Sequence, residues 1–292
     1  MKVTEMKRIL VIGVKGMAGH MIYNYLTETK LFDVYGIARN VPATKNIFNL
    51  DVSNTVQVEN VIQEGAFDYV VNCIGILNKD AEDNPSKAIW FNSYFPHYLE
   101  EITKGTDTKV IHISTDCVFS GSKGGYTEDD FKDGEGFYAQ SKALGEIVNN
   151  KDVTIRTSII GPELNENGIG LFHWFMSQPV TSKLKGYSKA YWSGLTTLEL
   201  AKVIVQVCKQ EITGLIQVAP GDKIDKYNLI SLFNSIYRNN KIKIQPFEEY
   251  TVDKSLKSIR PDFIYKVPTY IEMLIEQKEW IESHKELYPH YL

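Results

Sequence analysis

The sequence is poor in cysteine, with Cys73, Cys117 and Cys208 as its three examples among 292 residues. Three is an odd number and the positions are far apart, so neither a disulfide framework nor a cysteine metal site is expected. No group of histidines and carboxylates has the spacing of metal ligands, and we predict no metal. Unpaired cysteines of this kind are typical of a reducing compartment, which predicts a cytoplasmic protein.

A surplus of one charge is also lacking. Lysine and arginine total 32 and aspartate and glutamate 36, which gives a formal net charge of −4. Without a basic balance or a block of like charges, the sequence offers no footprint for nucleic acid. No stretch approaches the ~18–20 apolar residues that cross a bilayer, and the first residues lack the apolar block and cleavage site of a signal peptide. We therefore expect neither a nucleic-acid nor a membrane partner.

The composition itself is that of a globular protein, with 43% hydrophobic, 12% aromatic and 23% charged residues. The length fits one large domain or two interleaved ones. In the first half, strands are predicted over residues 8–12, 32–38, 46–50, 69–73, 109–113 and 153–156. Helices are predicted between them, over residues 17–27, 55–64, 88–103 and 138–149. Strands that are apolar on both faces and alternate with helices indicate a parallel sheet covered on both sides.

The second half is less regular. Helices are predicted over residues 195–209, 226–239 and 270–284, and a strand over residues 215–219. No long stretch rich in proline, glycine or serine separates the halves, so a second lobe is expected to follow without a flexible linker.

Three glycines follow the first predicted strand and open the first predicted helix, in the spacing Gly13-x-x-Gly16-x-x-Gly19. Such glycines allow a tight turn and let backbone N–H groups approach a pyrophosphate at the positive end of the helix. An ordinary strand-to-helix turn is the alternative interpretation. The position between strand and helix favours nucleotide binding, because the mechanism requires that context.

The residue that reads the cofactor ribose is expected about 20 residues further on, at the end of the second strand. Arg39 stands there, and no acid does. Arg39 and Lys15 would suit a 2′-phosphate, which favours NADPH over NADH, whereas solvated charges are the alternative. Asp51 follows the third strand and either accepts from the adenine amino group or caps a helix. The turn from Cys73 through Ile74 to Gly75 would bring backbone close to the cofactor.

The helix predicted from Tyr138 carries the pattern Tyr138-x-x-x-Lys142. Residues four apart on a helix share one face, so an ammonium group would lie beside a phenol and lower its pKa from ~10. Tyr138 would then pass a proton to a carbonyl oxygen as hydride arrives from a nicotinamide. Thr115, after the strand that ends in Ser114, would hydrogen-bond that carbonyl, although a hydroxyl that caps its own turn is the alternative.

These motifs resemble those of a known family. The extended short-chain dehydrogenase/reductases are similar at Gly13-x-x-Gly16-x-x-Gly19, Ser114-Thr115-Asp116-Cys117-Val118-Phe119 and Tyr138-x-x-x-Lys142. Within them, the dTDP-4-dehydrorhamnose reductase branch is similar at Tyr126-x-Glu128-x-Asp130, Ser141-Lys142-x-x-Gly145-Glu146 and Arg156-Thr157-Ser158. The resemblance covers most of residues 1–160 and is looser afterwards.

The resemblance implies an α/β fold with a Rossmann-type doubly wound parallel sheet and a smaller α/β C-terminal substrate lobe. The NAD(P)-binding domain would cover residues 1–160 and take in about 195–220, and the lobe would cover the remainder of 161–292. The implied reaction is NADPH-dependent reduction, with NADH as the other option, of the 4-keto group of a nucleotide-activated deoxysugar for surface polysaccharide synthesis. Tyr138 would be the acid, Lys142 its tuner, and Thr115 the group that orients the ketone.

The resemblance also implies a set of cofactor contacts, namely Gly16, Met17, Ala18, Arg39, Asp51, Val52, Cys73, Ile74, Gly75, Tyr138 and Lys142. Asn92 is either part of a proton path or a solvated helix residue. The implied substrate contacts are Thr115, Asp116, Cys117, Ile159 and Trp192, the last of which suits core packing equally well. The oligomeric state stays open, with a homodimer as one option.

Two of these positions depart from the branch. Cys117 stands where these reductases usually have tyrosine, and Ile159 where they have an aromatic residue, and both positions line the sugar pocket in that family. The sugar is therefore open. The segment from Trp192 to Ala201 is similar to reductases of UDP-linked amino sugars, so a UDP-4-keto-6-deoxy-N-acetylhexosamine reductase is one alternative. A non-catalytic, cofactor-binding regulatory subunit is a second alternative, and an epimerase or dehydratase is a third.

Overall fold

A computed structural model describes residues 6–291. The prediction that the first residues are not a signal peptide rests in part on residues 1–5, which lie outside the described residues. The chain divides into two compact units. Unit 1 consists of the described residues up to Ser114, together with Gly136–Ile155 and Val207–Leu215. Unit 2 consists of Thr115–Glu135, Arg156–Gln206 and the described residues from Ile216 onward.

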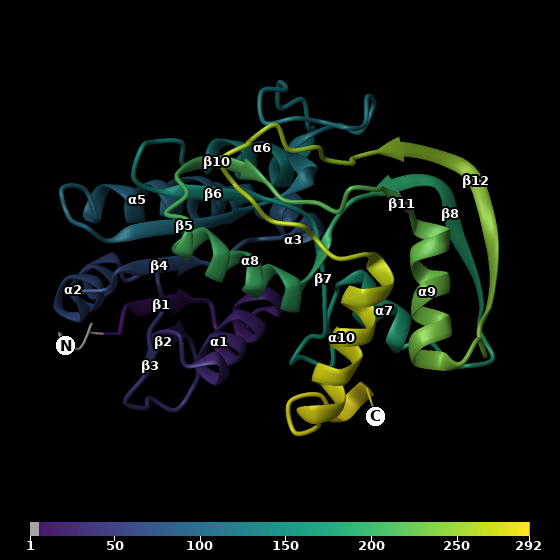
Figure 1. The fold of residues 1–292 in the computed structure, drawn as a ribbon, viewed down its shortest axis with the longest axis horizontal. Coiled ribbons are helices and arrows are strands. Elements are labelled where there is room, and N and C mark those ends of the chain that lie inside the picture. Colours follow the sequence, from purple (N-terminus) through teal and green to yellow (C-terminus); the bar gives the residue numbers. More distant parts are fainter. Residues whose placement is uncertain (1–5, 292) are drawn as a thin grey trace. The chain divides into compact units, whose positions relative to one another are not determined.

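A seven-stranded sheet organises unit 1, with the strand order β10-β6-β5-β4-β1-β2-β3 (Figure 1). Its strands, in that order, are Gly214–Gln217, Val153–Arg156, Lys109–Ser114, Tyr69–Asn72, Arg8–Ile12, Asp33–Ala38 and Ile47–Asn49. β1 pairs in parallel with β2 on one side and with β4 on the other, and β3 and β5 extend the parallel pairing. The predicted Rossmann-type parallel sheet is confirmed, and its strand order reverses at β1, where such sheets bind ligands.

Helices cover both faces of this sheet. The helices of unit 1 are α1 (Met17–Thr29), α2 (Thr55–Gly65), α3 (Asn78–Asp83), α4 (Pro85–Ala88), the π-helix η1 (Ile89–Tyr94), α5 (Phe95–Ile102) and α6 (Gly136–Leu144). Leu10 and Ile12 of β1 pack with Val58 of α2 and Leu99 of α5 in one core cluster. Because side chains alternate along a strand, the other residues of β1 face the opposite side. Figure 1 shows α1 on one side of the strands and α5 and α6 on the other.

Two predicted helices differ from the structure at the place where they approach each other. The helix predicted over 88–103 is interrupted by η1, because Pro96 has no N–H to donate to the carbonyl of Asn92 four residues earlier. That carbonyl faces Gly145, where an added Cβ would lie 1.8 Å from the Asn92 oxygen. The helix predicted over 138–149 ends at Leu144, directly before this close approach. Ile147 then donates its N–H to Thr154 Oγ1 at 2.9 Å instead of continuing the helix.

Unit 2 has a smaller sheet with the strand order β11-β8-β12 and a separate pair of strands, β7 and β9. The strands are β7 (Ile159–Ile160), β8 (Lys183–Trp192), β9 (Leu195–Thr196), β11 (Ile224–Asp225) and β12 (Lys243–Asp253). The helices are η2 (Asp116–Val118), α7 (Leu171–Met176), α9 (Lys226–Arg238), α10 (Tyr270–Ser283) and η3 (Pro289–Tyr291), and α8 (Thr197–Lys209) runs across the boundary between the units. Phe172, Phe233 and Leu274 belong to the buried core cluster of unit 2, which is rich in aromatic residues.

The strands β8 and β12 were not predicted from the sequence. In β8, buried Gly186, Ala190 and Trp192 alternate with exposed or half-buried residues, and the strand contains three lysines. β12 forms the outer edge of the sheet and contains Pro246, which is tolerated there because an edge strand leaves half its N–H groups unpaired. Charged residues on the open face of both strands hide the apolar pattern.

Within residues 6–291, no helix combines the length and the apolar character that a membrane span requires.

Candidate active site

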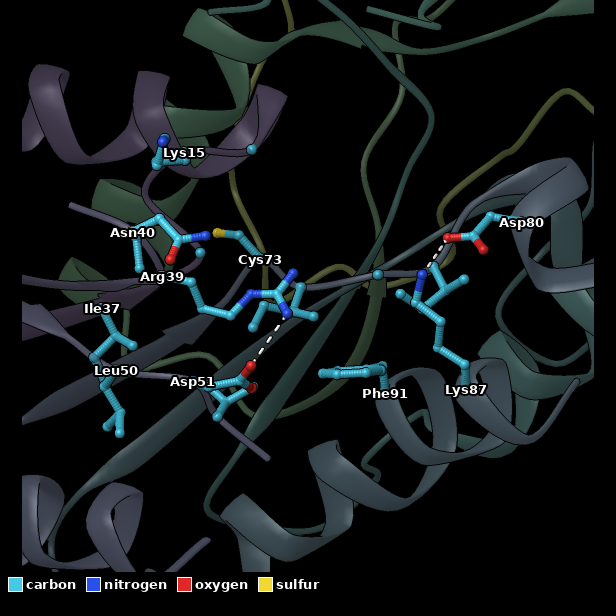
Figure 2. Close-up of a pocket in the computed structure, with 17 residues that line it drawn as sticks. Lys15, Ile37, Arg39, Asn40, Leu50, Asp51, Cys73, Asp80, Lys87 and Phe91 are labelled. Atoms are coloured by element: carbon cyan, nitrogen blue, oxygen red, sulfur yellow. Dashed lines mark hydrogen bonds and ion pairs between the residues drawn. The ribbon is translucent and has the colours of Figure 1, made fainter. Parts of the chain in front are cut away.

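A pocket of about 510 Å³ lies in unit 1 at the carboxyl ends of the strands around β1 (Figure 2). Nine of the predicted cofactor residues line it, namely Gly13, Lys15, Gly16, Arg39, Asp51, Val52, Cys73, Ile74 and Gly75. Met17, Ala18, Gly19, Tyr138 and Lys142 are not among its lining residues. The pocket occupies the place where parallel sheets with this strand order bind nucleotides.

The glycine turn forms one wall of this pocket. Gly13 has a φ of +95°, and a Cβ on Gly19 would lie 2.1 Å from the carbonyl oxygen of Gly13, so both positions require glycine. Gly16 is the N-cap of α1, and no side chain caps this helix end. The first N–H groups of α1 therefore remain available to an anion, and the residues present fit a dinucleotide pyrophosphate.

Arg39 and Asp51 face each other across the pocket, with Arg39 Nη1 3.1 Å from Asp51 Oδ2 (Figure 2). The N–H of Ser53 donates to Asp51 Oδ1 at 3.0 Å, and this bond, reinforced by Arg39, holds the pKa of Asp51 below its ordinary value. The interpretation of Asp51 as a helix cap is wrong, because Asn54 is the N-cap of α2. The Arg39 side chain is 65% exposed, so its guanidinium is accessible to a ligand as well as to Asp51.

Three further residues on the far wall escaped the sequence analysis. Lys87 Nζ lies 2.6 Å from Asp80 Oδ2, and this hydrogen bond lowers the pKa of the carboxyl. Phe91, one helical turn after Lys87, also lines the pocket (Figure 2). These residues come from α3, α4 and η1. The spacing of Lys87 and Phe91 places them on one face, but nothing in the sequence shows that this face is turned toward β1.

Lys142 is buried, with 4% of its surface exposed, in the middle of unit 1. Its ammonium donates to the carbonyl of Ile113 at 2.7 Å and lies 3.4 Å from His112 Nε2. Desolvation lowers the pKa of Lys142 to about 8, although the nearby carboxylate of Glu146 opposes the shift. Burial, together with the charge of Lys142, lowers the pKa of His112 as well, so the imidazole is neutral and Lys142 carries the charge.

Tyr138 stands four residues before Lys142 in the same helix, α6, and is half-buried. The carboxylate of Glu82 fixes the start of this helix, because its two oxygens accept the N–H groups of Phe137 and Tyr138 at 3.0 Å each. Gly136 has a φ of +85°, and a Cβ there would lie 2.6 Å from Glu82 Oε1. The spacing places the phenol and the ammonium on one helix face, and Glu82 is a positioning residue that the sequence analysis missed.

Asn92 is fully buried, so its interpretation as a solvated residue is wrong. Its side chain accepts the N–H of Ile76 at 2.7 Å and donates to the carbonyl of Ile76 at 2.9 Å and to Ser141 Oγ at 3.0 Å. Asn92 therefore ties the π-helix to the loop after β4 and to the helix that carries Tyr138 and Lys142.

The other predicted substrate residues belong to unit 2. Thr115 Oγ1 accepts the N–H of Cys117 at 3.1 Å and lies 3.1 Å from Asp116 Oδ1, so the hydroxyl does cap its own turn. Burial raises the pKa of the Cys117 thiol to about 11, which keeps it protonated near neutrality. Ile159 lies in β7, opposite Leu195 of β9. Trp192 is 3% exposed and belongs to the core of unit 2.

The parallel sheet and the glycine turn between β1 and α1 define an α/β protein of the Rossmann class. Residues 6–248 match the family model described as RmlD substrate binding domain, and the chain belongs to this family.

Individual relatives match over shorter stretches. The chain is 28% identical to a dTDP-4-dehydrorhamnose reductase of Aggregatibacter actinomycetemcomitans over 56% of this chain and 54% of that protein. It is 34% identical to the protein of the same name from Mycobacterium tuberculosis over 33% of each chain. It is also 24% identical to methionine adenosyltransferase 2 subunit beta of Xenopus laevis, over 51% of this chain and 45% of that one. The chain thus spans about half or less of the length of these relatives.

Solved structures match over nearly the whole chain. A dTDP-4-dehydrorhamnose reductase from Bacillus anthracis, in complex with NADP, has a TM-score of 0.77 at 20% identity and covers 95% of this chain and 99% of that one. A UDP-N-acetylglucosamine 4-epimerase from Methanobrevibacter ruminantium has a TM-score of 0.78 at 19% identity and covers 95% and 98%. At these identities the likeness concerns the fold alone.

Proposed function

We propose that this chain is a reductase that uses NADPH to reduce the 4-keto group of a nucleotide-activated deoxysugar. The observation that carries the proposal is the buried Lys142 ammonium, set four residues after Tyr138 in the same unit as the nucleotide pocket. The family relationship and the curated relatives named dTDP-4-dehydrorhamnose reductase support the same reaction. The activated deoxysugar formed would serve surface polysaccharide synthesis.

Different residues of unit 1 would bind different parts of NADPH. The N–H groups at the start of α1 would hold the pyrophosphate, and Arg39 with Lys15 would hold the 2′-phosphate through charge-assisted hydrogen bonds. Asp51 would accept from the adenine amino group once Arg39 turns toward the phosphate. When bound, the cofactor supplies the hydride.

The proposed catalytic residues would then supply one proton to the ketone oxygen. Tyr138 would donate its phenolic proton to the ketone oxygen as the alkoxide forms, and Lys142 would stabilise the phenolate that remains. Thr115 would hydrogen-bond the same oxygen and so orient the ketone. Asp116, Cys117, Ile159 and Trp192 complete the proposed substrate set in unit 2.

The direct test is the oxidation of NADPH, followed by absorbance, with dTDP- and UDP-linked 4-keto-6-deoxy sugars as separate substrates. We expect turnover with one of them and a product heavier by two hydrogens. Tyr138→Phe should lower kcat by roughly 10²–10⁴-fold, because general acid catalysis contributes that much, while NADPH affinity is retained. Absence of NADPH oxidation with every such sugar would count against a reductase.

The same experiment separates the alternatives. Turnover with the UDP-linked amino sugar, in place of the dTDP-linked sugar, identifies the second reductase. The segment from Trp192 to Ala201 favours this alternative, and Cys117 and Ile159 leave the identity of the sugar open. A product of unchanged mass from an unreduced nucleotide sugar identifies an epimerase. A regulatory subunit, which the likeness to methionine adenosyltransferase 2 subunit beta favours, would bind NADPH without turnover and co-purify with a partner enzyme.

A further inference from the structure

Lys226 is the first residue of α9, and its backbone is held on both sides. The side chain of Asp225 caps α9 by accepting the N–H of Asn228 at 2.9 Å. Ile224, two residues earlier, pairs with Trp192 across β11 and β8. The start of α9 packs so tightly on β8 that a Cβ on Gly186 would lie 2.6 Å from the Cα of Tyr227. The backbone from which the Lys226 side chain extends is therefore fixed next to Trp192.

The side chain of Lys226 lacks the partners that a half-buried lysine normally has. Its ammonium lies 5.1 Å from the centre of the Trp192 ring. Within residues 6–291 it makes neither a hydrogen bond nor an ion pair, whereas nearby Lys223 forms an ion pair with Asp253 and lies 4.3 Å from the Tyr191 ring. Desolvation lowers the pKa of Lys226, and the Trp192 ring and the charge of Asp116 offset the cost of burying the ammonium only in part. A buried charge whose cost is not fully offset within the fold indicates a functional position.

The groups around this ammonium are those next to the predicted reaction centre. Trp192 is fixed beneath it, because the indole N–H donates to Ser158 Oγ at 2.7 Å. The charge of Asp116 acts on Lys226 through space and partly restores its pKa. Asp116 is 5% exposed and directly follows Thr115, so their Cα atoms lie ~3.8 Å apart. All of these residues belong to unit 2.

We propose that Lys226 binds the hexose of the substrate, by donating a hydrogen bond to a neutral oxygen of the sugar ring or of its substituents. This inference rests on the proposed function, which assigns the ketone to Thr115. The electron-rich face of Trp192 lies against the ammonium, the negative charge of Asp116 acts on it through space, and both disfavour an anion as the ligand. The occupant is therefore a hydroxyl or carbonyl oxygen of the sugar, and the diphosphate lies elsewhere.

The test compares a nucleotide sugar with its diphosphate. Lys226→Met removes the charge and the donors but keeps the length of the side chain, and Lys223→Met is the matched control on the same unit. Binding of dTDP, dTDP-glucose, UDP and UDP-N-acetylglucosamine is measured by calorimetry. The comparison uses whichever nucleotide the wild type binds. Lys226→Met should raise the Kd of the nucleotide sugar about tenfold or more, as expected for a lost charge-assisted hydrogen bond. The Kd of the nucleoside diphosphate should stay within about twofold of the wild-type value. Lys223→Met should change neither.

Equal weakening of the conjugate and the diphosphate would overturn the proposal, because the ammonium would then hold phosphate. Unchanged affinity for both would overturn it as well. If Lys226→Met does not fold, Lys226→Gln is measured instead, and the same comparison between conjugate and diphosphate decides. A wild-type protein that binds none of the four ligands contradicts the proposed function itself, which is a different result from a variant that behaves like wild type.

Discussion

At the scale of single residues, the site depends on where charge is buried. Lys142 keeps its ammonium inside unit 1 at the cost of a lowered pKa, and its hydrogen bond to the Ile113 carbonyl fixes the position of that charge. Arg39, by contrast, is mostly exposed and shared with Asp51. The two cations therefore suit the different tasks proposed for them, since a fixed, buried charge would act on a neighbouring phenol and an exposed one would be accessible to a ligand.

The lowered pKa of Lys142 predicts a pH dependence. Below a pH of about 8 the folded protein holds an ammonium there, and above it an amine. Because the proposed role of Lys142 is to stabilise the Tyr138 phenolate with its charge, kcat/KM should fall as the pH rises through about 8 and that charge is lost. Initial rates from pH 6 to 10 measure this, and a rate that stays level to pH 10 contradicts it.

The same group also contributes to the pH dependence of stability. Its ordinary pKa is 10.5, so between about 8 and 10.5 the unfolded chain binds a proton that the folded chain has lost. The contribution of Lys142 to the free energy of unfolding should therefore rise with pH across this window. Lys142→Met should lack both this rise and the fall in rate.

Arg39 should decide between the two nicotinamide cofactors. Arg39→Ala removes a charge-assisted contact to the 2′-phosphate, which is worth roughly 1.5–3 kcal/mol, so the Kd for NADPH should rise by about 10–100-fold. NADH lacks that phosphate and should bind the variant within about threefold of the wild type. Fluorescence titration of the reduced nicotinamides provides both values. Equal losses for NADPH and NADH would show that Arg39 does not read the 2′-phosphate.

At the scale of elements, the turn between β1 and α1 is the most constrained part of the pocket. Gly19→Ala would place a Cβ 2.1 Å from the Gly13 oxygen, so the turn must open. We expect an NADPH affinity at least tenfold lower and a stability loss of about 1–3 kcal/mol, as for other overpacked sites. Gly221→Ala is the control, because a Cβ there has nothing within 4 Å. Calorimetry and thermal unfolding measure the two effects, and equal behaviour of both variants would refute the constraint.

The sequence predicts elements well where burial is uniform. The strand predicted over residues 8–12 matches β1, since its buried residues leave no other pattern. The helix predicted over 138–149 ends early because Gly145 meets the carbonyl of Asn92, a contact between segments far apart along the chain that the sequence does not reveal. The nine predicted residues that line the pocket follow strand ends, which is a local signal. Asp80, Lys87 and Phe91 could not be predicted, because only tertiary packing brings their helices to the pocket.

At the scale of the whole molecule, all residues that line the pocket proposed for NADPH belong to unit 1. NADPH at about a hundred times its Kd should add ~2.7 kcal/mol to the stability of the folded state and raise Tm by roughly 4 °C for a chain of this length. Scanning calorimetry measures the shift, and Arg39→Ala at the same NADPH concentration should show a smaller one. If the two units unfold separately, NADPH should move the transition of unit 1, and a thermogram that NADPH leaves unchanged contradicts binding there.

The edge strand β12 has a consequence for how copies of this protein behave beside one another. An open strand edge is a template on which a second chain can add its own strand, the first step toward fibrils. Here the edge strand contains Pro246, which has no N–H to donate, and the carboxylates of Glu248 and Glu249, and all three residues are exposed to water. At high protein concentration, copies of the chain should therefore repel one another along β12. No fourth strand should then add to the three-stranded sheet at this edge.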